Sequence, residues 1–337
     1  MRLRIGLVTT LSLLLAQSAQ AQLTSCPPGS VNGLGIPDRD RATQDACQMA
    51  VDVFQFVAPQ LGIALIGGNA TLGQGGALGG LGHFTIGLRA NVLDGDLPDV
   101  QNFPQPSTNG RQARELPTKS QFVGLPAVDA ALGLFKGLPL GLTNVGGIDL
   151  LLSASYVPTV GSPGDAVQVK PDQNLQLGLG ARLGLLQESL LVPGVSVTYL
   201  HRDLPTTTIT GTSTDVDVNV TNAKVKTDAW RITASKSLIL FSLAAGIGGD
   251  HYDQSATIQG TVKTSPIGTQ QSHAILLSQS MTRTNYFLDA SMNLLLAKIV
   301  AEIGQVSGGT VNTFNSFSGG AADKSRLYGS LGVRIGF

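Results

Sequence analysis

The sequence predicts an all-β fold, a transmembrane antiparallel up-and-down β-barrel. Three observations predict it: segments in which every second residue is apolar, links that alternate between long and short, and charged residues that make up only 13% of the chain. Soluble globular proteins carry about 25% charged residues, so this chain has too few for an ordinary solvated surface. The 42% hydrophobic content excludes wholesale disorder, and the formal net charge of 0 gives no basis for nucleic-acid binding.

Residues 1–21 are predicted to be a signal peptide. Arg2 and Arg4 form a basic start, residues 5–15 an apolar core, and Ala19-Gln20-Ala21 a cleavage site of the A-x-A type. The core is well short of the ~20 apolar residues that a membrane-spanning helix needs. We therefore expect the segment to be removed after export.

Cys26 and Cys47, the two cysteines of the chain, follow this signal. An exported chain reaches an oxidising compartment, where two thiols at this spacing can close a small loop. The pair is therefore a disulfide candidate, with two unrelated thiols as the alternative.

Residues 22–82 form a helical and glycine-rich segment ahead of the barrel. Apolar residues at spacings of three and four predict a helix from Pro37 to Val57, and Pro59 is expected to end it. The stretch "GGNATLGQGGALGGLG", residues 67–82, has too many glycines for the interior of a packed helix or strand. Two interpretations stay open: a plug that folds back into the barrel lumen, and a periplasmic extension.

Residues 83–337 are predicted to form the barrel. Strict alternation places apolar side chains on one face of a strand and polar ones on the other. The segments that show it cover residues 83–92, 124–135, 147–157, 174–185, 192–203, 225–236, 238–252, 285–294, 298–307 and 326–337. They give about ten strands, within a range of roughly 10 to 14, and their lengths suit a tilted crossing of a bilayer.

The links between these strands alternate in length, as they do in bacterial outer-membrane barrels. Long polar links such as residues 93–123 and 253–282 are separated by short ones such as residues 187–191. The polar strand face is rich in Gly, Ser, Thr and Asn with few charges, which suits a lumen. The apolar face carries Leu, Val and Ala, with aromatic residues toward the strand ends, as at lipid interfaces. We therefore expect the bacterial outer membrane as the location and its lipid as a partner.

Seven charged residues fall on the polar face of their predicted strands. They are Arg89, Asp149, Arg182, Arg231, Asp289, Glu302 and Arg334. A charge on the lipid face near the midplane costs about 2 to 4 kcal/mol, so these side chains are expected to face the lumen. There they could line a path for a polar solute or cross-link a closed barrel and its plug, and the pattern leaves both roles open.

The sequence contains no catalytic constellation, metal site or cofactor motif that we recognise. The four histidines lack metal-ligand spacing, and the glycines of residues 67–82 lack the strand–loop–helix context of a nucleotide site. His251 with Asp250 and Asp253 is the best local candidate for a hydrolase site at the outer rim, but such residues in a polar loop are ordinarily just solvated. We expect no enzyme activity, no metal and no cofactor.

The chain ends in "LGVRIGF", with an apolar residue at every second position. These residues are Leu331, Val333, Ile335 and Phe337. In this ending the sequence resembles bacterial outer-membrane β-barrel proteins, whose last strand commonly ends in Phe. The resemblance implies that the four residues are an assembly signal and that the barrel assembly machinery is a partner. The segment before the barrel loosely resembles the long-chain fatty-acid transporter type, in which a plug sits in the lumen and hydrophobic solutes diffuse through.

Passive transport of small or hydrophobic solutes is the leading functional expectation, because a glycine-rich segment precedes a barrel with a mixed-charge polar face. The alternative is a structural or surface-interaction protein, adhesin-like, since the polar stretch at residues 205–225 resembles a protruding hairpin. An outer-membrane hydrolase comes third.

Overall fold

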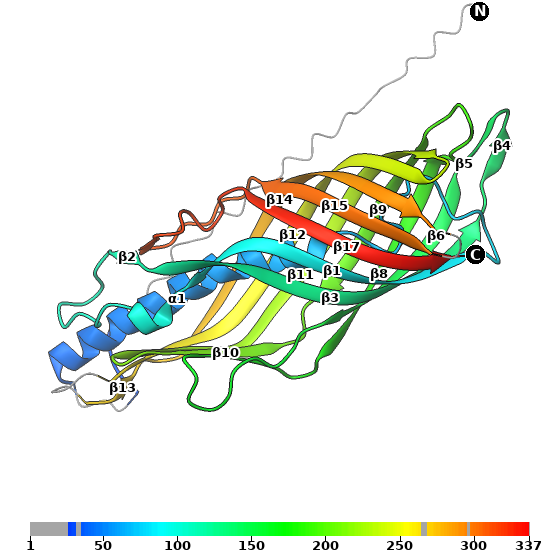
Figure 1. Cartoon of the computed structure of the whole chain (residues 1–337). Coiled ribbons are helices and arrows are strands. Elements are labelled where there is room, and N and C mark those ends of the chain that lie inside the picture. The colour runs from blue at the N-terminus through cyan, green and yellow to red at the C-terminus, as the bar shows by residue number, and fades with distance from the viewer. Residues whose placement is uncertain (1–25, 32–34, 264–267, 295–296, 337) are drawn as a thin grey trace, which may run out of the picture.

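A computed structural model of the chain describes residues 26–31, 35–263, 268–294 and 297–336 (Figure 1). The predicted signal peptide, residues 1–21, lies outside the described residues, as does Phe337.

Ten antiparallel strands form a closed ring within the described residues. Their order around the ring is their order in the sequence, and the last strand pairs with the first, from Thr85 opposite Gly336 to Leu93 opposite Tyr328. The ring consists of β1 (Phe84–Pro98), β3 (Thr118–Phe135), β6 (Gly147–Tyr156), β8 (Leu175–Leu186), β9 (Gly194–Asp203), β11 (Val216–Leu238), β12 (Phe241–Val262), β14 (Ile275–Asn293), β15 (Lys298–Ser307) and β17 (Arg326–Gly336).

The two faces of the ring differ as a membrane requires. On β8, Leu177 and Leu179 point outward and are exposed, whereas Gly178, Gly180 and Arg182 are buried. A soluble barrel would bury its apolar side chains inside, so the reversed arrangement indicates a transmembrane barrel. The predicted fold class is confirmed, and this architecture places the protein in the bacterial outer membrane.

The connections define the two ends of the barrel. Short elements within them are η1 (Val100–Asn102), β2 (Glu115–Leu116), β4 (Leu138–Leu140), β5 (Thr143–Val145), β7 (Val167–Pro171), β10 (Thr207–Thr212), β13 (Gln270–Gln271) and β16 (Ser316–Phe317). The shorter connections, including the β4–β5 hairpin, share one end with the start of β1 and the end of β17, whereas β2, β10 and β13 lie at the other end (Figure 1). The short-turn end of such a barrel faces the periplasm, and the long loops face outside.

The helix α1 (Pro37–Ile66) lies inside the barrel (Figure 1). Its length and composition would qualify it as a membrane span, but 89% of its most apolar window is buried in the protein. Gly260, near the outer end of β12, packs against the backbone of Ala46, and Gly80 packs against Lys136 at the periplasmic end of β3. The segment from α1 to Gly80 therefore runs through the lumen from the extracellular end to the periplasmic end, and we call residues 37–82 the plug.

Several sequence predictions of element ends were wrong. The helix continues through Pro59 to Ile66. Within a helix, proline loses one backbone hydrogen bond, but the Gln60 side chain fastens this turn, because it exchanges hydrogen bonds with the backbone of Asp96 on β1 at 2.8 and 2.9 Å. Five strands also extend outward through residues expected to form polar links: β1 to Pro98, β3 to Thr118, β11 to Val216, β12 to Val262 and β14 to Ile275.

Candidate functional site

The glycine-rich half of the plug packs its backbone directly on the backbone of the barrel wall. A Cβ atom on Gly75 would overlap the carbonyl oxygen of Gly194 and lie 2.7 Å from the backbone nitrogen of Ser235. A Cβ atom on Gly133 of β3 would overlap the carbonyl oxygen of Gly80. Only glycine permits such an approach, which explains the composition of residues 67–82.

All seven charged residues predicted to face the lumen contact the backbone of plug residues 66–78. Arg89, Arg182, Arg231 and Arg334 donate to the carbonyl oxygens of Gly67, Gln74, Ile66 and Ala70, and Asp149, Asp289 and Glu302 accept from the N–H groups of Leu78, Gly73 and Gly68. An irregular backbone in a lumen needs partners for its N–H and C=O groups. We call this set the clasp.

Several clasp residues are also paired with one another or with further charges. Arg182 lies 2.7 Å from Asp149, and Arg231 lies 2.9 Å from Glu302; all four side chains are buried. These pairs bring both charge signs to the same short stretch of the plug. A buried charge with such a partner avoids the large penalty of an isolated one.

Two members of this network were absent from the sequence prediction. Asp129 binds Arg89 at 2.6 Å, and Arg202 donates to the carbonyl oxygens of Leu65 and Gly68, both at 2.9 Å. Both residues fall within predicted strands and on the inward face, so the same alternation could have identified them.

The clasp closes the middle of the lumen. Two cavities at the plug–wall contact there have volumes of about 10 and 20 Å³. That is room for about one water molecule each. In this structure the charged residues fasten the plug rather than line an open axial channel.

A large apolar cavity lies above the clasp, toward the extracellular end. Its volume is about 580 Å³. The helix contributes Val57, Leu61 and Ala64 to its lining, and the barrel wall contributes apolar side chains that include Leu125 and Val225. Small-molecule sites are typically apolar cavities of ~300 to 1,000 Å³, so its size and lining suit an apolar solute.

The cavity coincides with a gap in the barrel wall. Strand β3 pairs with β6 only from Ala127 inward, and its outer part, residues 118–126, has β1 on one side and no ladder among the described residues on the other. Across the gap, Val160 forms a single bridge with β7. Phe122 and Val160, one from each side, line the cavity and are 78% and 50% exposed, so the cavity opens to the outside there.

Aromatic side chains place this gap near the outer membrane interface. Phe122 on β3 and Tyr156 at the end of β6 flank it and are exposed on the outer face. Exposed aromatic residues in transmembrane barrels gather where lipid meets water. A solute dissolved in the outer leaflet would therefore reach the cavity sideways.

A second, smaller space opens at the periplasmic end. It has a volume of about 400 Å³, and Gln74, Lys298 and Arg334 are among its lining residues. Gln74 belongs to the plug and also contacts the clasp residue Arg334, at 3.4 Å. The clasped stretch of the plug thus separates an apolar outer cavity from a polar inner one.

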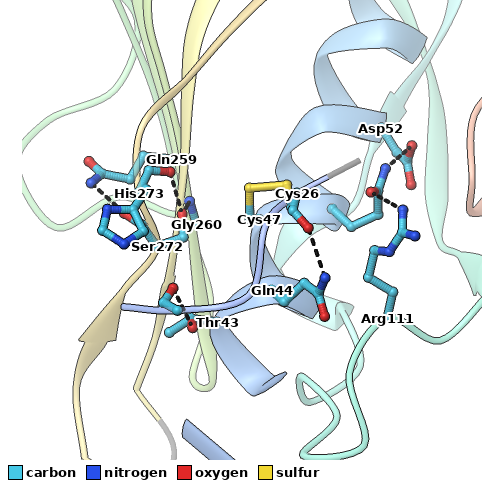
Figure 2. Close-up of a disulfide and its surroundings, with 12 residues drawn as sticks. Cys26, Thr43, Gln44, Cys47, Asp52, Arg111, Gln259, Gly260, Ser272 and His273 are labelled. Carbon is cyan, nitrogen blue, oxygen red and sulfur yellow. Dashed lines mark hydrogen bonds between the residues drawn. A yellow bond between two sulfur atoms is a disulfide. The ribbon is translucent and has the colours of Figure 1, made fainter. Parts of the chain in front are cut away.

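The structure also describes the two cysteines of the disulfide candidate and the residues of the hydrolase candidate. Cys26 and Cys47 form a disulfide at the extracellular end of α1, with an S–S distance of 2.03 Å (Figure 2). His251 points to the outer face of β12 beside Asp253, whereas Asp250 is buried and points into the lumen. Because these side chains lie on opposite faces of the strand, they do not form one site.

No group of metal-binding side chains occurs in the described part of the chain.

Three residues of the predicted assembly signal lie on the lipid face of β17. Leu331, Val333 and Ile335 are 60%, 47% and 42% exposed, and the prediction for Phe337 falls outside the described residues.

We expect Phe337→Asp to lower the amount of membrane-inserted protein, because the C-terminal ring is the predicted recognition element. Heat-modifiable migration of membrane fractions measures this, with Lys263→Met as a matched control; unchanged insertion would contradict the assembly role.

Comparisons with known proteins give little beyond the architecture. No protein-family model and no curated protein matches the chain. Similar solved structures include the transport unit of the autotransporter AIDA-I from Escherichia coli, with 8% identity, a TM-score of 0.34 and coverage of 87% of this chain and 99% of that chain. They also include the toluene transporter TodX from Pseudomonas putida, with 11% identity, a TM-score of 0.31 and coverage of 94% and 95%. At such identities and TM-scores the likeness supports no argument about the solute, so function has to be argued from the geometry.

Proposed function

We propose that this protein passes small apolar solutes across the outer membrane. The main support for this proposal is the apolar cavity of about 580 Å³, which opens through a gap in the barrel wall. Below this cavity the lumen is closed by the clasp. A solute would leave the outer leaflet through the gap, bind beside α1 and continue toward the periplasmic space when the clasped stretch of the plug rearranges. Because the solute moves from lipid to an apolar lining, this first step exposes none of its apolar surface to water, which would cost about 25 cal/mol per Å².

The contacts of residues 205–225 support transport rather than the alternative of a free adhesive arm. Strand β10 pairs with the outer part of β11, and Val216, Val218 and Val220 are buried against the inside of the molecule. Val218 and Val220 line the apolar cavity. The segment therefore serves as part of the cavity wall, which favours transport over surface adhesion.

Filling the cavity is expected to lower uptake of an apolar solute several-fold. Val57 is half-buried on α1 and faces the cavity, so Val57→Trp would occupy space that the solute needs. Uptake of labelled naphthalene by cells that depend on this protein measures the effect, and Ala90→Trp on the exposed lipid face of β1 is the matched control. Wild-type uptake by Val57→Trp, or wild-type cells no faster than cells without the protein, would contradict the proposal.

A further inference from the structure

The start of the described chain lies at the extracellular end of the barrel. Val31 donates a backbone hydrogen bond to Gln271 at 2.8 Å, and Ser30 forms a bridge with Ser272; both partners belong to the loop between β12 and β14. Cys26 is joined by the disulfide to Cys47 on α1 (Figure 2). Residues 26–31 are therefore fastened to an outer loop and to the outer part of the helix.

Two other outer loops bind α1, one in its outer part and one near its middle. Asp45 accepts hydrogen bonds from two backbone N–H groups of the loop at residues 99–117, at 2.8 and 2.9 Å. Asp52 accepts from two backbone N–H groups of the loop at residues 308–325, at 3.0 and 2.9 Å. Both side chains are buried. Carboxylates bonded to backbone N–H groups form the stronger, charge-assisted class of hydrogen bond, so these loops are fixed on the helix.

The other end of the plug is at the periplasm. Leu78 is bonded to Asp149 of the clasp, Gly80 packs on Lys136, and β1 then starts at Phe84. The direction of the plug, from outside to inside, follows from these contacts together with the periplasmic position of the short turns.

We propose that this protein displays its amino-terminal side on the cell surface and that residues 37–82 are a permanent additional crossing of the outer membrane. A chain exported with a signal peptide starts this process in the periplasm, so residues 26–31 have to move outward as the barrel closes around the plug. The inference does not depend on the proposed transport function. One consequence is that the plug cannot leave the barrel as a unit: two loops bind α1, the disulfide joins α1 to residues that a third loop holds, and β1 continues from the inner end of the plug.

An epitope inserted directly before Cys26 tests the proposal in full-length protein. Control insertions follow Gly164, in an outer loop, and Gly141, at the tip of the periplasmic β4–β5 hairpin; neither glycine has an atom within 4 Å of its Cβ position. We expect antibody to bind the tags at Cys26 and Gly164 on intact cells, and the tag at Gly141 only after permeabilisation. A tag at Cys26 that behaves like the one at Gly141 would overturn the proposal.

A single-cysteine variant gives a second test without an insertion. Val31→Cys, in a Cys26→Ser/Cys47→Ser background, replaces a side chain that is 52% exposed. The matched control is Leu142→Cys, which is 70% exposed at the periplasmic hairpin. An impermeant maleimide on intact cells is expected to label the first at least tenfold more than the second. If neither variant is labelled on intact cells and both are labelled equally after permeabilisation, residue 31 lies in the periplasm and the inference is refuted.

Discussion

Replacing Arg231 with methionine is expected to turn a closed barrel into one that conducts ions. The guanidinium donates to Glu302 at 2.9 Å and to the carbonyl oxygen of Ile66 at 2.6 Å, and it stacks 4.6 Å from the ring centre of Phe287. Without this guanidinium the plug loses its hydrogen bond at Ile66, and the buried Glu302 carboxylate loses the cation it pairs with. Breaking a buried pair in this way costs about 3 to 5 kcal/mol. Single-channel recording in planar bilayers measures the conductance, and urea titration of heat-modifiable migration measures the stability.

A surface ion pair supplies the matched control for this change. Lys263 lies 2.7 Å from Asp217 on the outer extension of β11 and β12, and both side chains are partly exposed. Such pairs contribute about 0 to 1 kcal/mol, so Lys263→Met should leave stability and conductance unchanged. The double variant Arg231→Met/Glu302→Gln should recover part of the stability, because residue 302 then no longer carries an unpaired charge. If Arg231→Met conducts no more than Lys263→Met does, the clasp does not hold the plug.

The sequence pattern was sufficient to predict the ring and the inward direction of its charges. Alternation has a period of two, so it states which side chains share a face. The charges that faced the lumen, such as Arg89 and Glu302, could not go on the lipid face without a large energetic cost. The same reasoning applies to Asp129 and Arg202, which we did not single out even though each lies within a predicted strand.

The alternation pattern could not predict which groups the inward-pointing charges would contact. Their common partner is the backbone of residues 66–78. Every residue has the same backbone groups, so such a contact leaves no signal in the sequence apart from glycines, which lack a side chain. The glycines of that stretch were compatible with a plug and with an extension. Only the positions of Gly194 and Gly133 on the wall, opposite Gly75 and Gly80, show that glycines on both partners form one contact.

The apolar cavity was also beyond the reach of local patterns. It combines the helix face at Val57 and Leu61 with strand residues such as Leu125 and Val225, which are far apart in the chain. Its opening depends on where a ladder stops, at Ala127 of β3. Strand ends are the least regular part of a hydrophobic pattern, because the membrane no longer requires alternation outside the bilayer.

Gly75 is the plug position where we expect one added methyl group to have the largest effect. A Cβ atom there meets the backbone of Gly194 and Ser235. Backbone atoms cannot rotate away as a side chain can, so the plug or strand β9 has to shift. Overpacking of this kind costs about 1 to 3 kcal/mol, and the shift would loosen the neighbouring clasp contact between Gln74 and Arg182. Gly75→Ala should therefore unfold at lower urea concentration and conduct ions more often than wild type.

Gly124 is the matched control, because the nearest atom to a Cβ atom there is the carbonyl oxygen of Asn91, at an ordinary contact distance of 3.8 Å. Gly124→Ala should stay within about 0.5 kcal/mol of wild type, as substitutions without a packing conflict usually do. The two variants carry the same chemical change on the same barrel, so a difference between them isolates the backbone contact. Equal urea midpoints and equal conductance for both would mean that the plug tolerates movement at Gly75, and a mobile plug would then have to be considered as the normal state of the barrel.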